Sequence, residues 1–212
     1  MDIIPDKIQV YAEKFSDPED PLLEAINKET LSSHPHAHML SGHLQGRFLA
    51  IVSKMLRPQY ILEIGTFTGY SALCLAEGLT PAGKLHTIEL REEDAQTARQ
   101  NFNRSNQADR IILHTGNALE IIPTLEPVWD LVFIDADKVS YQAYYDLVIP
   151  KMRSGGVILA DNVLFHGQVV EDPITGKNAK AIHEFNQFLR NDDRVEKVII
   201  TLRDGLMMIR KK

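Results

Sequence analysis

The hydrophobic pattern divides the chain into two parts that predict different kinds of structure. In residues 1–57, apolar positions recur at helical spacing and predict three helices, at 6–15, 21–31 and 41–56. The acidic stretch 16–20 precedes the second helix and suits its N-cap region. Their apolar faces are larger than one sheet edge needs, so this segment is expected to cover a ligand pocket or to pair two subunits.

From residue 60 onward, short strand-like runs alternate with helical stretches, which predicts a parallel sheet covered by helices on both faces. The last two strands are joined only by a tight turn at 203–205, so they must be antiparallel neighbours. A dinucleotide-binding dehydrogenase normally has a crossover where this hairpin lies, so the order favours a nucleoside-binding methyltransferase. The predicted strands are 60–64, 84–89, 111–114, 131–134, 157–160, 195–201 and 206–210, and the helices are 70–78, 92–106, 118–125, 141–152 and 179–189.

Composition narrows the class of protein further. The 212 residues suit one domain, 1–212, and 44% hydrophobic with 25% charged residues is typical of a globular protein. A net charge of -6, with no basic block beyond the short tail Arg210–Lys212, disfavours nucleic acid as a partner. The N-terminus has neither the apolar run of a signal peptide nor the length of a membrane span, so we expect a cytoplasmic protein without a membrane partner.

The first predicted strand leads into a glycine-containing turn that is typical of a ligand site. Gly65 and Gly69 let the backbone turn tightly, and Thr66 and Ser71 follow within the turn and at the start of the next helix. The spacing is G-x-x-x-G and not the G-x-G-x-x-G of a dinucleotide site. Glu63, at the strand end, suits a ligand with positive charge, such as a sulfonium compound with an amino group. The alternative is a turn that merely connects strand to helix.

Two further strand ends complete a nucleoside site. Glu89 closes the second strand, 24 residues after Gly65, where an acid can accept hydrogen bonds from both ribose hydroxyls. Asn117 and Ala118 follow the third strand, where an amide or a backbone N–H can read the edge of an adenine ring. Taken alone, Glu89 would more simply be a solvated charge.

Hard oxygen donors follow the fourth and fifth strands. Asp135 ends one of these strands, and Asp161 and Asn162 end the other. Because neighbouring parallel strands end at the same edge, these side chains are expected to converge. Two carboxylates and a carboxamide suit Mg²⁺, with Mn²⁺ or Ca²⁺ as substitutes, and they do not suit Zn²⁺. The alternative for any one aspartate is a helix N-cap.

With these motifs the chain resembles the cation-dependent O-methyltransferases, the class of caffeoyl-CoA O-methyltransferase and, more distantly, catechol O-methyltransferase. The resemblance implies the α/β, Rossmann-like seven-stranded methyltransferase fold and a homodimer. The matching stretches are Met39–Ser41 with Gln45 and Gly46, EIGTFTGYS at 63–71, Glu89, FIDADKVSY at 133–141, GGVILADNVL at 155–164 and RDGLMMIRK at 203–211.

The resemblance also implies roles for single residues. It identifies Lys138 as the catalytic lysine and Asp135, Asp161 and Asn162 as ligands of the divalent cation. Motifs and resemblance together predict these S-adenosylmethionine contacts: Met39, Ser41, Glu63, Gly65, Thr66, Gly69, Ser71, Glu89, Asn117, Ala118, Asp135 and Asp137.

The chemistry that follows is methyl transfer to a hydroxyl of a small catechol-like acceptor. A phenol with a pKa of about 10 is a poor nucleophile at neutral pH, and chelation of a cation by two vicinal hydroxyls would raise its acidity. Lys138 could take the proton or stabilise the phenolate by its charge. The alternative for Lys138 is a surface charge at a helix start.

The segment after the cation ligands departs from the plant enzymes, which typically have tryptophan and asparagine where Phe165 and His166 stand. Both are predicted acceptor contacts: Phe165 can stack on an aromatic ring, and His166 changes the polar contact. Caffeoyl-CoA, another phenylpropanoid, a flavonoid and a free catechol therefore all stay open as acceptors. The histidines of 34–43 invite a metal site, but a loop over the cofactor and acceptor is favoured.

Three rival functions stay open. An NAD-dependent oxidoreductase is disfavoured by the glycine pattern, the terminal hairpin and the acids of the cation site. A non-catalytic nucleoside-binding domain would not need Lys138 and the three cation ligands. Methylation of RNA or protein is disfavoured by the acidic net charge.

Overall fold

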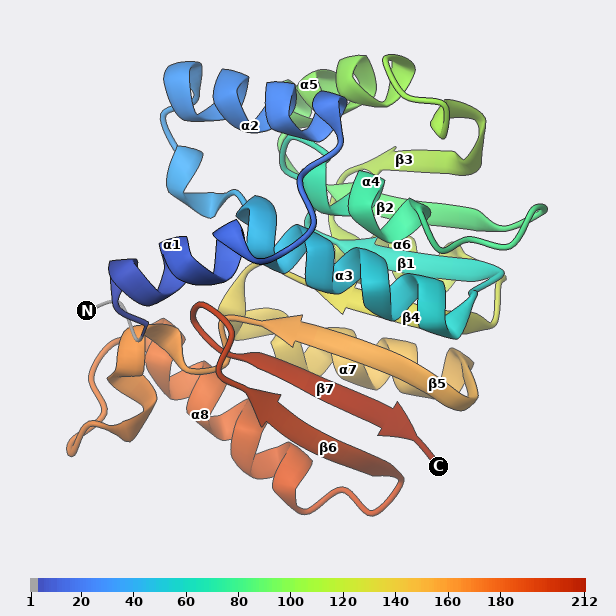
Figure 1. Ribbon diagram of the computed structural model, residues 1–212. Helices are drawn as coiled ribbons and strands as arrows, with labels where there is room; N and C mark the ends of the chain where they lie inside the picture. Colours follow the sequence, from blue (N-terminus) through green and yellow to red (C-terminus); the bar gives the residue numbers. More distant parts are fainter. Residues whose placement is uncertain (1–3) are drawn as a thin grey trace.

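The computed structural model describes residues 4–212 and is built on one mixed sheet of seven strands in the order β3-β2-β1-β4-β5-β7-β6 (Figure 1). β1 to β5 are parallel, whereas β7 is antiparallel to both β5 and β6. The predicted terminal hairpin is therefore confirmed. The strands are β1 Tyr60–Ile64, β2 Lys84–Glu89, β3 Ile111–Thr115, β4 Trp129–Ile134, β5 Met152–Asp161, β6 Val195–Ile200 and β7 Leu206–Lys211.

Helices cover both faces of this sheet, as the alternating pattern predicts. The helices are α1 Asp6–Lys14, α2 Pro21–Ser33, α3 Gly42–Leu56, α4 Tyr70–Ala76, α5 Glu92–Asn103, α6 Ala118–Ile121, α7 Tyr141–Val148 and α8 Lys177–Arg190. Alternate residues of each strand point to opposite faces. In β4, Val132 belongs to the core that α6, α7 and α8 cover, and Phe133 belongs to the core that α2, α3, α4 and α5 cover.

The largest differences between the observed and the predicted ends are at α6, α7 and β5, where proline or strand pairing intervenes. α6 and α7 each end early and continue as a short 3₁₀ turn that contains Pro123 or Pro150, because proline lacks the N–H that an α-helix needs. β5 begins at Met152, five residues earlier than predicted, because Met152 pairs with Trp129 across a register shift in β4. The apolar run 157–160 marks only its buried half.

The three predicted N-terminal helices are present. α3 packs against α4, while α1 and α2 lead into it through a 3₁₀ turn at Ala37–Met39 (Figure 1). The Asp20 side chain accepts a hydrogen bond from the Leu22 N–H, which caps α2 within the acidic stretch as predicted. Among residues 4–212, no helix combines the length and hydropathy that crossing a membrane would require.

Candidate functional site

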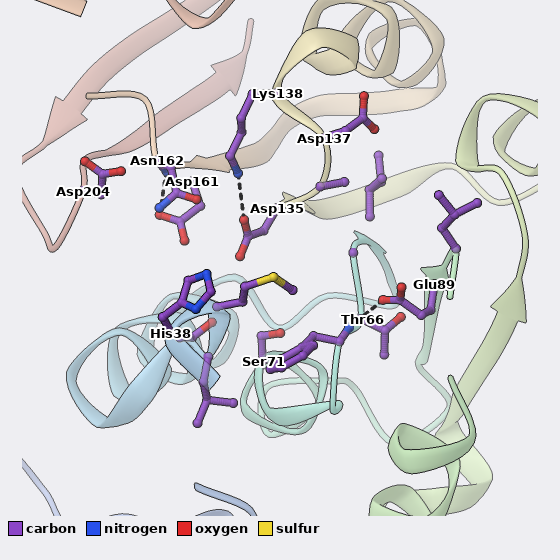
Figure 2. Close-up of a pocket in the computed structure, with 18 of the residues that line it drawn as sticks. His38, Thr66, Ser71, Glu89, Asp135, Asp137, Lys138, Asp161, Asn162 and Asp204 are labelled. Carbon is purple, nitrogen blue, oxygen red and sulfur yellow. Dashed lines mark hydrogen bonds and ion pairs between the residues drawn. The ribbon is translucent and has the colours of Figure 1, made fainter. Parts of the chain in front are cut away.

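A cavity of about 950 Å³ lies beyond the carboxyl ends of the parallel strands, where ligands bind in open α/β sheets (Figure 2). It brings together nearly all the residues that the sequence predicts for the site. Glu63 and Gly69 are the two predicted residues that do not line it. The predicted residues in its wall are Met39, Ser41, Gly65, Thr66, Ser71, Glu89, Asn117, Ala118, Asp135, Asp137, Lys138, Asp161, Asn162, Phe165 and His166.

The glycines of the turn are required by its geometry. Gly65 has a φ of 99°, and a Cβ there would lie 2.0 Å from the carbonyl oxygen of Asp135. Gly69 has a φ of 87° and faces the ring of Phe102, behind the turn. Gly65 therefore lets the turn lie directly against the end of β4, whereas Gly69 seats the turn on α5.

Glu63 lies beneath the turn and is fully buried. Its Oε2 accepts a hydrogen bond from the Thr87 hydroxyl, and its Oε1 has no partner within residues 4–212. Burial raises the pKa of Glu63 to about 8, so the side chain is mostly a neutral acid at pH 7. Its place is behind the cavity wall, and a direct contact with a ligand stays a prediction.

Glu89 is held at the cavity edge by backbone groups on either side. Its Oε2 accepts from the Phe67 N–H at 2.7 Å, and its Oε1 accepts from the Arg91 N–H at 3.0 Å. These bonds fix the direction of the carboxylate. Asn117, by contrast, uses its side-chain oxygen to cap α6 at the Leu119 N–H, and it lines the cavity together with the small Ala118.

The predicted cation ligands converge at the ends of β4 and β5, as Figure 2 shows for Asp135, Asp161 and Asn162. Asp161 is only 2% exposed. Its Oδ1 accepts from the Asn162 N–H at 2.8 Å, and its Oδ2 accepts from the Gln45 side chain at 2.7 Å. Burial and the nearby charge of Asp135 raise the pKa of Asp161.

This donor set fits a hard divalent cation. The Asp161 carboxylate is buried and lies near the Asp135 carboxylate, and their two negative charges repel each other. A cation between them would stabilise both. Within the described residues no three His, Cys, Asp or Glu side chains form a metal-binding group. The third donor of the predicted set is the carboxamide of Asn162, which suits Mg²⁺ and not Zn²⁺.

Lys138 lies on the same edge and makes two hydrogen bonds. Its Nζ donates to Asp135 Oδ1 at 3.0 Å and to the Tyr141 hydroxyl at 2.7 Å. Tyr141 in turn donates to the Asp161 carbonyl oxygen at 2.9 Å. Burial disfavours the Lys138 ammonium, but Tyr141, Asp135 and Asp161 outweigh it and raise the pKa of Lys138 above its ordinary value. The resting side chain is therefore an ammonium.

Several residues of the site escaped the sequence reasoning. Tyr144 donates its hydroxyl proton to the predicted cofactor contact Asp137. Tyr141 holds Lys138, and Arg203 and Asp204 line the cavity from the β6–β7 turn. Lys138 and Tyr141 are three residues apart at the start of a helix, and this spacing could have indicated their contact. Arg203 lies in the predicted turn 203–205, but no local signal indicates its contact with Gln45, which is 158 residues away in the sequence.

The histidines near α3 do not converge on one point. His34 Nε2 lies 2.9 Å from Asp94 Oδ1, and His43 Nε2 lies 2.6 Å from the Asp17 carbonyl oxygen. His38 lines the cavity with Met39 and Ser41, so the segment lies at the site as the favoured alternative predicts. On the other side, Asp204 accepts from the His166 N–H and fixes the start of the acceptor segment.

Comparison with known proteins gives matches over nearly the whole chain. The O-methyltransferase family model matches residues 12–212. A catechol O-methyltransferase of Niastella koreensis is 31% identical over 188 residues, which cover 87% of this chain and 84% of that protein. Caffeoyl-CoA O-methyltransferase 1 of Eucalyptus globulus is 30% identical over 195 residues, covering 87% and 79%. An SAH-bound methyltransferase of Podospora anserina superposes with a TM-score of 0.91 at 29% identity, covering 99% and 98% of the two chains.

Proposed function

The chain belongs to the O-methyltransferase family and is an S-adenosylmethionine-dependent O-methyltransferase, and from that premise we propose that it methylates a hydroxyl of a small catechol-like acceptor with the help of a divalent cation. The single observation that carries the proposal is a cluster of four polar residues in the cavity that the glycine turn also lines. These residues are Asp135, Asp161, Asn162 and Lys138. The relatives named as catechol and caffeoyl-CoA O-methyltransferases support the acceptor class.

At the cofactor end of the cavity, an acidic side chain and backbone groups bind the nucleoside. Glu89 receives the ribose hydroxyls, while Ala118 and the backbone of Asn117 face the adenine. Met39, Ser41, Ser71 and Asp137 also line the cavity, and they receive the methionine part of the cofactor. Glu63 supports the turn from behind.

At the other end, Asp135, Asp161 and Asn162 hold the cation, Mg²⁺ or one of its substitutes Mn²⁺ and Ca²⁺. When bound, the cation raises the acidity of the acceptor hydroxyl, and S-adenosylmethionine supplies the methyl group. Lys138, which Asp135 and Tyr141 hold beside this position, stabilises the phenolate by the charge of its ammonium. Phe165 and His166 face the acceptor ring, and the cavity walls fix the reacting atoms in line.

The test is release of S-adenosylhomocysteine with a panel of catechols that includes caffeic acid and caffeoyl-CoA. We expect turnover with Mg²⁺, none after chelation by EDTA, and at least a 100-fold loss for Asp161→Asn. Asp193→Asn, at an exposed site far from the cavity, is the matched control and should behave as the unmodified protein. Turnover that persists in EDTA would refute the role of the cation, and turnover with RNA or protein alone would refute the acceptor class.

The same proposal extends to assembly and location. Residues 1–212 form one domain, and the protein is a homodimer in the cytoplasm. The support for pairing is the exposed apolar set of the first helix, Ile8, Val10 and Tyr11, each 58% exposed or more. Light scattering after gel filtration should give twice the chain mass of 24.0 kDa. A single-chain mass at micromolar concentration would contradict the dimer.

A further inference from the structure

Gln45 is a buried polar side chain that contacts a predicted cation ligand from outside the predicted ligand set. It lies in α3, is 1% exposed, and is 116 residues away from Asp161 in the sequence. Its Nε2 donates to Asp161 Oδ2 at 2.7 Å. Since Asp161 Oδ1 already accepts from the Asn162 N–H, each carboxylate oxygen has one donor from the chain.

The direction of the Gln45 amide is set by a third residue. Arg203 Nη1 donates to Gln45 Oε1 at 3.0 Å. A guanidinium has only donors, so the amide must turn its oxygen to Arg203 and its NH₂ to Asp161. The Asp161 carboxylate, which only accepts, favours the same orientation, since the flipped amide would direct an oxygen at it.

Arg203 also holds the start of α3. The same Nη1 donates to the Ser41 carbonyl oxygen at 2.5 Å, and Ser41 is a predicted cofactor contact. Arg203 is half-buried and stands in the β6–β7 turn with a φ of 49°. One guanidinium therefore joins three parts of the chain that meet at the cavity: the last hairpin, the start of α3 and the end of β5.

We infer that Gln45 and Arg203 are positioning residues, with Arg203 orienting Gln45 and Gln45 orienting Asp161 toward the cation. The inference rests on the proposed function, because it assigns the two residues to the cation ligand that the proposal names. A hydrogen-bond donor behind a metal ligand typically contributes 10- to 100-fold to metal affinity, and that is the size of effect expected here.

The test measures binding of Mn²⁺ by electron paramagnetic resonance and binding of S-adenosylhomocysteine by calorimetry, both without acceptor. Gln45→Met keeps the length of the side chain and removes its donor, so Mn²⁺ affinity should fall about 10-fold or more. Arg203→Gly keeps the turn, since glycine adopts a positive φ without strain. It should weaken Mn²⁺ binding and also S-adenosylhomocysteine binding, because Ser41 loses its anchor, whereas Gln45→Met should weaken Mn²⁺ binding alone.

The double variant distinguishes a relay from two separate effects. If Arg203 acts on Asp161 through Gln45, then adding Arg203→Gly to Gln45→Met causes no further loss of Mn²⁺ affinity. Additive losses would overturn the relay. Arg210→Gln, which removes an exposed ion pair with Glu196 on the same hairpin, is the control and should leave both affinities unchanged.

The remaining outcomes separate this inference from the proposed function. Saturable Mn²⁺ binding by the unmodified protein, equalled by both single variants, would refute the positioning role and leave the proposed function intact. Absence of saturable Mn²⁺ binding by the unmodified protein would refute both. Should Gln45→Met fail to fold, as judged by circular dichroism, the turn variant Arg203→Gly decides the question by itself, and unchanged Mn²⁺ affinity in it overturns the inference.

Discussion

The two ends of the cavity are built in different ways. At the cofactor end, the glycine turn, Glu89 and their backbone bonds come from β1, β2 and the segments that directly follow them. At the cation end, Asp161 is held by side chains from α3 and, beyond it, from the β6–β7 turn. The first end depends on the path of the backbone, whereas the second depends on side chains brought together by the whole fold. Changes should therefore affect the two ends differently.

The largest expected effect is that of Gly65→Ala at the cofactor end. The new Cβ would lie 2.0 Å from the Asp135 carbonyl oxygen, at a φ of 99°. Either the turn or the end of β4 must move, which should lower the free energy of unfolding by more than about 3 kcal/mol and abolish S-adenosylhomocysteine binding. Urea denaturation and calorimetry measure the two losses.

Gly176→Ala is the matched control for this change. Gly176 also has a positive φ, 85°, but its Cβ would meet nothing within 4 Å. The strained backbone of the variant should therefore lower its free energy of unfolding by only about 1–3 kcal/mol, and the variant should bind S-adenosylhomocysteine normally. Equal effects of the two variants would mean that strain alone, and not the close approach of Gly65 to β4, governs the turn.

At the cation end, Lys138→Met should lower kcat by about 100-fold or more while leaving S-adenosylhomocysteine affinity unchanged. The physical reason is the loss of the ammonium beside Asp135 and Tyr141. Lys138→Arg keeps the charge and should recover part of the loss. An arginine variant as slow as the methionine variant would contradict stabilisation by charge alone. Lys180→Met, at an exposed position of α8, is the control and should retain full activity.

The same contrast explains what the sequence could predict. The alternating strands, the terminal hairpin and the acids at the strand ends follow from apolar runs and from the residues next to them. The family resemblance added Met39 and Ser41, so that 15 cavity-lining residues were predicted in all. Gln45 and Arg203 stand in stretches that match the family, but their roles could not be predicted, because their partners lie 116 and 158 residues away in the sequence. Glu63 differs from these residues: the sequence predicts a cofactor contact, whereas the structure buries its side chain beneath the turn and outside the cavity lining, so the contact stays a prediction.

Glu63 gives a pH-dependent test of the cofactor end. Its pKa of about 8 lies above the ordinary value of 4.5, so the folded protein keeps a proton that the unfolded chain releases between these values. The contribution of Glu63 to the free energy of unfolding should therefore be fully present below about pH 4.5. It should fall as the pH rises to about 8, by at most ~1.4 kcal/mol per pH unit. The amide of the Glu63→Gln variant cannot titrate, so the difference in unfolding free energy between this variant and the unmodified protein should grow in the variant's favour over that range.

The measurement is urea denaturation of both proteins from pH 5 to pH 8, because only their difference removes the contributions of other groups. A parallel fall in the two proteins would mean that Glu63 is already ionised in the folded protein over this pH range. In that case Glu63 would belong to the binding surface, as the sequence first indicates, and not to the support behind it.

The smallest expected effect is that of Tyr144→Phe, between the two ends. The change removes the hydroxyl that donates to Asp137, an exposed residue at the cavity wall. Loss of one hydrogen bond to a charged group should weaken S-adenosylhomocysteine binding about 5- to 10-fold, since the Asp137 carboxylate becomes free to turn away from the cofactor. Tyr145→Phe removes a bond of the same kind, to Asp192 at 2.7 Å, away from the cavity. It should lower the melting temperature without changing affinity. If both variants changed only the melting temperature, the Asp137 carboxylate would not contact the cofactor, and the wall between the two ends would be structural.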